Sequence, residues 1–405
     1  MGRPAMDNRD FLANIEFSLN WKTEYSTHAE TYYGLNVNFW RDCFPSELHK
    51  NLMQAGPNDR IEWTPPGNGM VEAYQEKKIF SVKPSQFSGL GRSETAIIPR
   101  KGRYYPKGLL KGIAHVFPEN VEPFRLADVS DDRLVVDFNH PLAGKELAVS
   151  LRIRDMWRKD REKGGACYDW VETITTGPGM QARIHGEPTD FQADNGYSRQ
   201  DETPDAGFYQ EPRMVHHVDE TARSVIRNLY SQELKPGMKV LDLMASWESH
   251  IDRELGIGSL SGVGLNQKEL SSNPQLSDYH VLDLNQTVSL PFEADSFDAV
   301  VCTNSVEYLT DPMRIFRMVA DVLRPGGIFM VTFSNRWFPP KVTRLWTELH
   351  EFERMGLVSE YFLQSGRFKG LQTYSMRGLP RPVDDKYYPE FRLSDPVYAV
   401  WARKE

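Results

Sequence analysis

Short apolar runs alternate with helical or polar segments over the last part of the chain, from Lys239 onward. Strand-like runs lie at 240–243, 261–265, 279–282, 297–302 and 328–333. A helical stretch at 311–323 ends at the sequence RPGG, directly before the last of these runs. Apolar runs separated by crossover segments are typical of parallel strands that are buried on both faces. Residues 234–405 are therefore expected to form an α/β domain with a doubly wound, Rossmann-like sheet.

The stretch SFDAVVCTNSVEYLTDPMRIFRMVADVLRPGGIFMVTF, at residues 296–333, narrows this fold further. Together with the order of the strands, it resembles the class I methyltransferases that depend on S-adenosylmethionine (SAM). The resemblance implies an enzyme that binds SAM as its cofactor and passes the methyl group to an acceptor. Open α/β sheets bind ligands beyond the carboxyl ends of their strands, where the strand order reverses. That rule places the site on four segments, 242–250, 264–267, 283–285 and 303–308.

The loop after the first strand, DLMASWESH at residues 242–250, departs from this family. The family places three glycines there, so that the backbone can approach the cofactor without Cβ atoms in the way. Here the three positions hold Met244, Ser246 and Glu248. Either the domain has lost its cofactor and is a pseudoenzyme, or side chains hold SAM in a differently shaped turn. We favour the second interpretation, because the loop supplies hydroxyls, an imidazole and an indole, whose face attracts a cation such as a sulfonium.

Further predicted cofactor contacts lie on the other segments of this rim. Asn266 stands where the family usually carries an acidic residue for the ribose, and its amide can both accept and donate hydrogen bonds. Asp283 matches the position that usually meets the adenine amino group. The predicted cofactor-binding residues are Asp242, Met244, Ser246, Trp247, His250, Asn266, Asp283, Leu284, Asn304 and Ser305.

Residues 208–219, FYQEPRMVHHVD, gather polar and aromatic groups just before a helical pattern at 219–234. With DLMASWESH, GLNQKEL, DLN and FSNRWFPPKVTRLW, this segment resembles one subfamily of methyltransferase-like proteins of bacteria and plant plastids. We predict a substrate lid that holds Tyr209, Arg213 and His217 over the methyl group. His217 and His250 are the candidate bases, since an imidazole titrates near neutral pH. The structural alternative is that Asp219 caps the helix and Arg213 pairs with it.

Three stretches lie before the methyltransferase-like domain. Residues 1–66 are rich in aromatic residues, and apolar spacing predicts a helix over 38–55. Residues 67–155 alternate like β-strands, with strands expected at 134–138 and 145–153 around a turn at 139–144. Residues 156–233 are expected to form a loop-rich connector that contains the lid.

The sequence ADVSDDRLVVDFNHPLAGKELAVSLRI, at residues 127–153, carries a second resemblance. It is similar to the last two strands of the SlyD-like group of FK506-binding (FKBP) prolyl isomerases. The upstream half lacks that family's aromatic pocket residues. We therefore expect an N-terminal β-rich, FKBP/SlyD-like domain that serves as a scaffold and has no isomerase activity.

Charge and composition limit what this protein is expected to bind and where it is expected to be found. The net charge of -8 disfavours nucleic acid, which needs a basic face to displace counterions from phosphates. No run of about 18 apolar residues occurs, so no membrane span is expected. The three cysteines lack metal-ligand spacing, so no metal site is expected, and they fit a reducing, cytoplasmic location.

A small molecule is the first choice of acceptor. A thiol or sulfide is the best single guess, since a thiolate is a strong nucleophile that needs few binding groups. Residues 334–340 are expected to close the acceptor pocket, or else to form a turn around Asn335. Two other functions stay open: a non-catalytic scaffold or chaperone-like protein with a pseudo-methyltransferase domain, and a prolyl isomerase-methyltransferase that acts on protein. A homo-oligomer is compatible with each of them.

Overall fold

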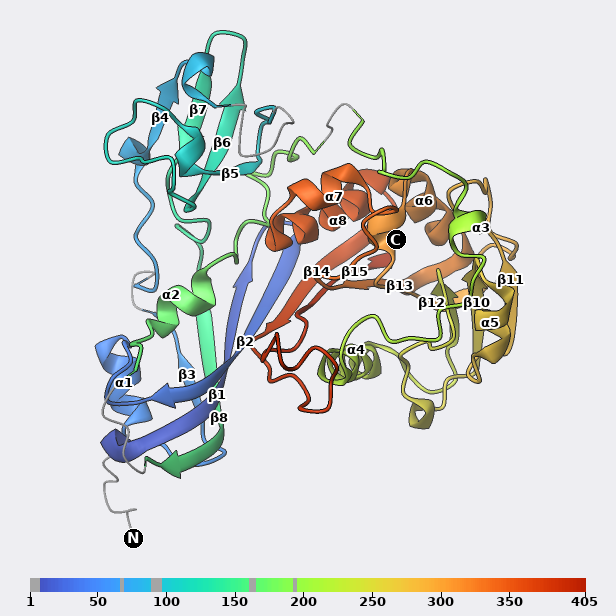
Figure 1. The fold of residues 1–405 in the computed structure, drawn as a ribbon, viewed down its shortest axis with the longest axis horizontal. Helices are drawn as coiled ribbons and strands as arrows, with labels where there is room; N and C mark the ends of the chain where they lie inside the picture. The colour runs from blue at the N-terminus through green and yellow to red at the C-terminus, as the bar shows by residue number, and fades with distance from the viewer. Residues whose placement is uncertain (1–7, 66–68, 89–96, 160–164, 192–194) are drawn as a thin grey trace.

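One large sheet organises the molecule. The computed structural model describes residues 8–65, 69–88, 97–159, 165–191 and 195–405 (Figure 1). Eleven strands form the sheet, in the order β11-β10-β9-β12-β13-β15-β14-β2-β1-β8-β3. A second sheet of four antiparallel strands, β4-β7-β6-β5, stands apart from it.

The C-terminal half of the large sheet is the expected Rossmann-like unit. Its strands are β9 (Lys239–Leu243), β10 (Ser259–Gly264), β11 (Asp278–Val281), β12 (Phe297–Thr303), β13 (Leu323–Phe333), β14 (Phe368–Arg377) and β15 (Val397–Lys404). The first five are parallel, and β15 runs antiparallel between β13 and β14. The five predicted strands are confirmed, although β13 begins at Leu323, before the RPGG turn that was expected to precede it.

Helices cover both faces of this unit. The predicted helices at 219–234 and 311–323 are confirmed as α4 (Glu220–Glu233) and α6 (Pro312–Val322). Alternate residues of β12 point to opposite faces. Ala299 and Val301 pack in the cluster that contains α4, whereas Val300 and Cys302 pack in the cluster that contains α6 and α8 (Glu351–Ser365). The short helices α5 (Gln267–Ser272) and α7 (Arg344–Glu348) complete the unit.

The N-terminal region extends the same sheet, which corrects the expectation of a helical extension over 1–66. Here the strands are β1 (Phe11–Lys22), β2 (Ser26–Asn38), β3 (Arg60–Trp63) and β8 (Ala148–Arg158), and the pairs β2–β1, β1–β8 and β8–β3 are antiparallel. The helix expected over 38–55 is only α1 (Ser46–Leu52), which begins after Pro45. Mutual hydrogen bonds between Asn38 and Asp42 hold the preceding residues in a turn. The expected boundary at 66/67 lies outside the described residues.

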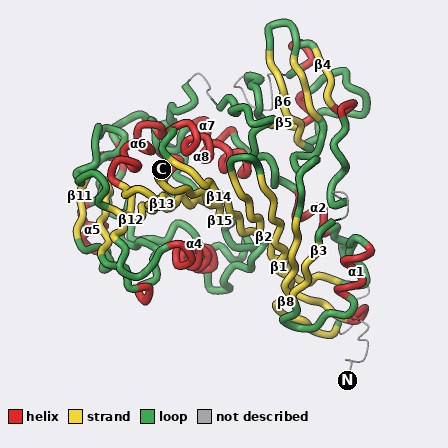
Figure 2. Tube along the Cα trace, turned by 180° about the vertical axis from the view of Figure 1, so that it is seen from behind, coloured by secondary structure: helices red, strands yellow, loops and turns green. Residues whose placement is uncertain are grey.

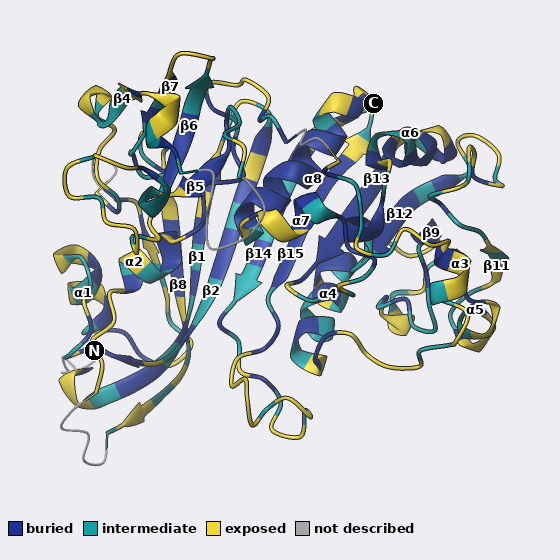
Figure 3. Ribbon diagram, turned by 45° about the horizontal axis from the view of Figure 1, so that its top comes forward, coloured by how far each residue is buried: buried dark blue, intermediate teal, exposed yellow. Residues whose placement is uncertain are grey.

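The join between the two halves of the sheet is the parallel pair β14–β2, whose strands run side by side in Figure 2. Buried polar groups mark it. His28 Nδ1 lies 2.7 Å from Thr373 Oγ1, and the Glu30 carboxylate accepts hydrogen bonds from Ser375 and Gln181. Burial raises the pKa of Glu30 to about 7. The N-terminal strands are therefore part of one continuous hydrogen-bonded layer, dark blue in Figure 3 where its residues are buried.

The predicted hairpin at 134–153 does not form. The small sheet contains β4 (Ile79–Val82), β5 (Tyr104–Pro106), β6 (Pro123–Val129) and β7 (Leu134–Asp137). The strand at β7 and the turn after it are present, but β7 pairs with β4 and β6, whereas β8 pairs with β1 and β3. Alternation correctly predicts that Val149, Leu151 and Ile153 are buried, but it does not choose the partner strand. The FKBP/SlyD-like interpretation therefore loses the hairpin on which it rested.

The connector between the halves contains α2 (Trp170–Thr175) and α3 (Asp205–Phe208). Trp170 stacks on Phe17 of β1, with ring centroids 5.3 Å apart, so α2 packs on the N-terminal strands. Across the described ranges, no helix combines the length and the apolar character that crossing a membrane requires.

Candidate active site

A single pocket at the carboxyl ends of β9, β10 and β12 contains all of the predicted site residues. They are Tyr209, Arg213, His217, Asp242, Met244, Ser246, Trp247, His250, Asn266, Asp283, Leu284, Asn304 and Ser305. Phe338, from the segment expected to close the acceptor side, lines the same pocket. The location predicted from the strand-end rule is thus the location found. The roles of the individual residues remain predictions.

The loop after β9 has a glycine-like backbone without glycines. Met244 has φ +62°, and His250, at the other end of the loop, has φ +51°. Asn304, after β12, has φ +48° and lines the same pocket. Left-handed backbone costs a residue other than glycine about 1–2 kcal/mol. Three of the nine positive-φ residues other than glycine in the described structure line this pocket, and strain of this kind is often found where the geometry serves a ligand.

The family's glycines allow a close backbone approach in the loop after the first strand. Here two backbone segments approach closely at the end of β10 instead. The Ala245 amide donates to the Val263 carbonyl oxygen at 2.7 Å, which seats the loop against the end of β10. A Cβ atom at Gly264 would lie 2.2 Å from the Ala245 carbonyl oxygen. The glycine that lets the chain pass closely beside the pocket is therefore Gly264.

Asn266 has a structural role that corrects its predicted contact with the ribose. Its Oδ1 accepts from the amides of Lys268 and Glu269 and so caps α5. Its Nδ2 donates to the carbonyl oxygens of Tyr209 and Gln210, at 2.8 and 3.0 Å. All hydrogen-bonding positions of the amide are occupied, so none is left for ribose hydroxyls.

Glu269 links the lid to the loop after β9. One carboxylate oxygen accepts from the Arg213 amide at 2.6 Å, and the other accepts from Ser246 Oγ at 2.6 Å. The side chain lines the pocket, and a carboxylate that accepts two hydrogen bonds retains unused lone pairs. The family usually carries an acidic residue at the position of Asn266. Here the acidic side chain of this region is Glu269, three residues later.

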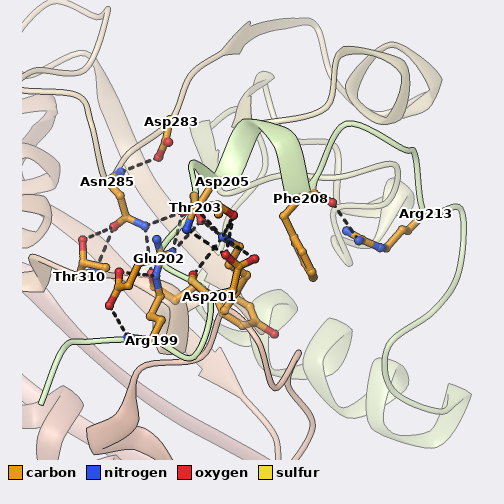
Figure 4. Close-up of polar contacts among 12 residues, drawn as sticks. Arg199, Asp201, Glu202, Thr203, Asp205, Phe208, Arg213, Asp283, Asn285 and Thr310 are labelled. Carbon is orange, nitrogen blue, oxygen red and sulfur yellow. Dashed lines mark hydrogen bonds and ion pairs between the residues drawn. The ribbon is translucent and has the colours of Figure 1, made fainter.

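A buried charge cluster fixes the start of the lid at α3 (Figure 4). The Asp205 carboxylate accepts from Arg199 Nη1 at 2.7 and 2.9 Å and from Asn285 Nδ2 at 2.9 Å. Lys341, which is completely buried, lies 3.4 Å from Asp205 and 3.1 Å from Asp201. Asn285 also holds Thr310, so the lid is connected to the segments after β11 and β12.

The end of the lid is fixed at Asp219. Its carboxylate caps α4 through the Ala222 amide, as the structural alternative predicted. Its partners are otherwise Ser394, the Asp395 amide and Arg381, on the loop between β14 and β15. The predicted pairing of Asp219 with Arg213 is wrong. Both ends of the lid are thus attached. Between Arg213 and Asp219 it meets the loop after β9, where Trp247 Nε1 donates to the Val215 carbonyl oxygen at 3.4 Å.

Arg213 lies among aromatic rings. Its guanidinium carbon is 4.4 Å from the ring centroid of Phe208, 5.3 Å from that of Tyr209 and 5.1 Å from that of Phe338. Nη2 donates to the Phe208 carbonyl oxygen, while the buried Nη1 has no hydrogen-bond partner among the described residues. His217 contacts the same Phe338 ring edge-on at 5.1 Å. A guanidinium donor and an imidazole thus lie at one end of the pocket.

The two candidate bases are neutral at pH 7. Desolvation, with Arg213 as a further positive neighbour, lowers the pKa of His217. Burial lowers the pKa of His250 to about 4, although Glu248 opposes this. A neutral imidazole can accept a proton, so both meet the first requirement of a general base. Burial raises the pKa of Tyr209 well above its usual value, so its phenol keeps its proton.

Residues 257–331 match the model of a family described as methyltransferase domain. The segment from before β10 to within β13 therefore matches a methyltransferase domain. Methyltransferase GfsG of Streptomyces halstedii is 27% identical over 134 residues, which are 30% of this chain and 47% of that protein. The ubiquinone biosynthesis O-methyltransferase of Marinobacter nauticus is 26% identical over 142 residues, 31% of this chain and 57% of that protein.

The chain spans about half the length of these two relatives. Among solved structures, a SAM-dependent methyltransferase from Mesorhizobium loti aligns with 44% of this chain and 96% of its own. Its TM-score is 0.31 and its sequence identity is 18%.

Two acidic residues of this pocket, Asp205 and Glu269, lie outside the segments that the sequence predicted. His216, Glu248, Asn285 and Tyr308 lie within the predicted segments but were not among the predicted site residues. Glu248 lies 3.0 Å from His216 and 3.3 Å from Arg223, so it joins the loop to the lid and to α4. The spacing of Asn266 and Glu269, a helix cap with an acid three residues later, could have indicated Glu269 as a first-turn residue facing the strand end.

Glu307 makes the stability of this domain dependent on pH. It is 2% exposed, its Oε2 has no hydrogen-bond partner in the described part of the chain, and burial raises its pKa to about 8. The folded state therefore keeps a proton that the unfolded chain releases above its ordinary pKa of 4.5. Stability must then fall as the pH rises from about 5 through 8.

We expect Glu307→Gln to raise the melting temperature at about pH 8 and to change it little at about pH 5. Calorimetric melting of both proteins at these two pH values measures the difference. Glu390→Gln, on an exposed loop, removes the same charge and serves as the control. Equal shifts of the Glu307→Gln variant at both pH values would contradict a buried, protonated Glu307.

Proposed function

We propose that this chain transfers the methyl group of SAM to a small-molecule acceptor. The strongest support is a strained loop beside buried polar atoms that have no hydrogen-bond partner in the described structure. Nδ1 of His250 and Oδ1 of Asn304 both belong to pocket residues and lack hydrogen-bond partners among the described residues. Unpaired buried polar atoms cost about 1–3 kcal/mol each, and a polar ligand removes that cost. A pocket that had lost its ligand would be under no selection to keep both features.

The residues present fit the polar groups of SAM. Asn304 Oδ1 would accept from its ammonium group, and the Glu269 carboxylate would accept from ribose hydroxyls in place of Asn266. Asp283 is half-buried and lines the same pocket, and desolvation raises its pKa. Its carboxylate could accept from an amino group. Bound SAM would supply an electrophilic methyl group on a sulfonium, and the protein would align it and exclude water.

An oxygen acceptor is our first choice. A hydroxyl keeps its proton at neutral pH and needs a base, and neutral His217 at the pocket mouth would supply one. The relatives named for ubiquinone biosynthesis are O-methyltransferases. The thiol or sulfide guessed from the sequence is the second choice, because a thiolate needs no base and leaves the position of His217 unexplained.

The acceptor would enter between the lid and the loop that joins β14 to β15. A second hollow lies there, lined by 215–220 of the lid and by Arg381, Lys386 and Tyr387 of the loop. It shares Val215, His216, His217 and Val218 with the main pocket. These four residues form the wall between the hollows, and His217 would meet an acceptor on its way toward the methyl group.

The first test is binding of SAM and of S-adenosylhomocysteine. We expect either ligand to stabilise the protein by about 2.7 kcal/mol at one hundred times its Kd, measured as a rise in melting temperature. A panel of hydroxyl, thiol and amine compounds, scored by release of S-adenosylhomocysteine, then identifies the acceptor class. If neither ligand shifts the melting temperature at saturation, the pseudoenzyme interpretation replaces this proposal.

A further inference from the structure

Two cysteines that are distant in sequence lie side by side on the N-terminal part of the molecule. Cys43 lies between β2 and α1, and Cys167 lies just before α2. Their Sγ atoms are 3.7 Å apart, although 124 residues separate them in the chain. Both residues are exposed, so small molecules can reach the thiols.

The backbone on both sides of the pair is held in place. The Cys43 amide donates to the Tyr168 carbonyl oxygen at 2.8 Å, and Cys43 forms a bridge with Asp169. The adjacent Asp42 carboxylate accepts from the indole Nε1 of Trp170 at 2.8 Å. Trp170 is buried in the core of the N-terminal strands, which ties this segment to the sheet.

A disulfide requires an S–S distance of about 2.05 Å and imposes a narrow range of backbone separations. Here the two segments are already paired through their backbones, and the two sulfur atoms lie 3.7 Å apart. A cross-link between distant segments usually costs conformational entropy, because the segments must first be brought together. Here folding has already brought them together.

We propose that Cys43 and Cys167 form a reversible disulfide, a site of oxidative modification whose reaction partner is a low-molecular-weight disulfide such as glutathione disulfide. One cysteine thiolate attacks the glutathione disulfide, forms a mixed disulfide and releases one glutathione thiolate. The second cysteine thiolate attacks the protein sulfur of the mixed disulfide and releases the other. Two protein thiols are oxidised, one disulfide is reduced to two glutathiones, and the two thiol protons pass to them.

The remaining cysteine does not take part in this reaction. Cys302 is 1% exposed within β12, and burial raises its pKa well above the usual value. An oxidant in solution cannot reach this buried thiol in the folded protein, whereas Cys43 and Cys167 are exposed. Cys302 can therefore serve as the unreacted control cysteine within the same chain.

The bond would close a loop that contains α1, β3, the small sheet and β8. A disulfide that closes a long loop lowers the conformational entropy of the unfolded chain and so stabilises the folded state. A stabilisation typical of native disulfides raises the melting temperature by roughly 5 °C. The oxidised form is thus expected to be the more stable one.

The full-length protein is incubated with glutathione disulfide, alkylated with iodoacetamide and measured by intact and peptide mass spectrometry. We expect one alkylated cysteine, Cys302 after unfolding, and a cross-linked pair of peptides that contain Cys43 and Cys167. Added glutathione should restore three alkylated cysteines. Cys43→Ser and Cys167→Ser should each retain one glutathione on the remaining exposed thiol, whereas Cys302→Ser should form the cross-link as the wild type does. Three alkylated cysteines, or glutathione on both exposed cysteines of the wild type, would overturn the proposal.

Discussion

Replacing Gly264 with alanine is expected to weaken SAM binding by about 100-fold or more and to destabilise the domain by about 1–3 kcal/mol. The new Cβ would lie 2.2 Å from the Ala245 carbonyl oxygen, a backbone atom that cannot rotate away. The loop would have to move off β10, and the hydrogen bond from the Ala245 amide to the Val263 oxygen would break with it. Titration calorimetry with SAM and thermal melting measure both effects.

Gly262→Ala is the matched control, two residues earlier on the same strand. Its Cβ would lie 2.7 Å from Cδ1 of Leu276, the end of a flexible side chain that can turn aside. It should retain SAM affinity and lose little stability. If Gly264→Ala binds SAM as the wild type does, the loop is not held by this close approach, and the account of the pocket fails.

Replacing His217 with alanine is expected to lower turnover by about 100-fold while leaving SAM affinity nearly unchanged. His217 lies on the lid against Phe338 and contacts neither β9 nor the loop after it by hydrogen bond in the described structure. The base is active in its neutral form, so turnover of the wild type should fall as the pH drops through the pKa of His217, which lies below 6.5. That acidic limb should disappear in the variant.

Two further variants separate a base from a positioning role. His217→Gln keeps a hydrogen-bonding side chain but cannot take a proton, so it should be as slow as the alanine variant. Arg213→Lys keeps the charge but loses the planar guanidinium between Phe208 and Phe338, and should raise the acceptor KM more than it lowers kcat. Wild-type turnover in His217→Ala would move the role of base to His250.

The site could be located from the sequence because its residues follow strands. Apolar runs determine where β9, β10 and β12 end, and the ends of neighbouring parallel strands meet at one edge. Met244, Asp283 and Asn304 lie in one pocket for that reason alone. Glu269, which was missed, belongs to the first turn of α5, beyond the end of β10, where the direction of a side chain depends on packing.

The sequence could not predict which distant segments pair with one another. The pattern from Ala148 to Arg158 marks a strand, but nothing in it selects β1 as the neighbour in place of β7. Likewise the amide of Asn266 suits a ribose, and only the approach of the lid backbone at Tyr209 uses up its donors. Contacts between segments distant in the chain decided both outcomes, and local patterns carry no information about them.

The parallel pair β2–β14 has a consequence for how this protein is made. His28 and Thr373, which meet across the pair, are 345 residues apart in the chain. At synthesis rates of about 5–20 residues per second, β2 leaves the ribosome roughly 20 to 70 seconds before β14 exists. During that time a strand of 13 residues offers an open edge, which other nascent chains can join. Holdase chaperones that cover this edge, and the speed of the ribosome itself, should therefore set the soluble yield of the protein.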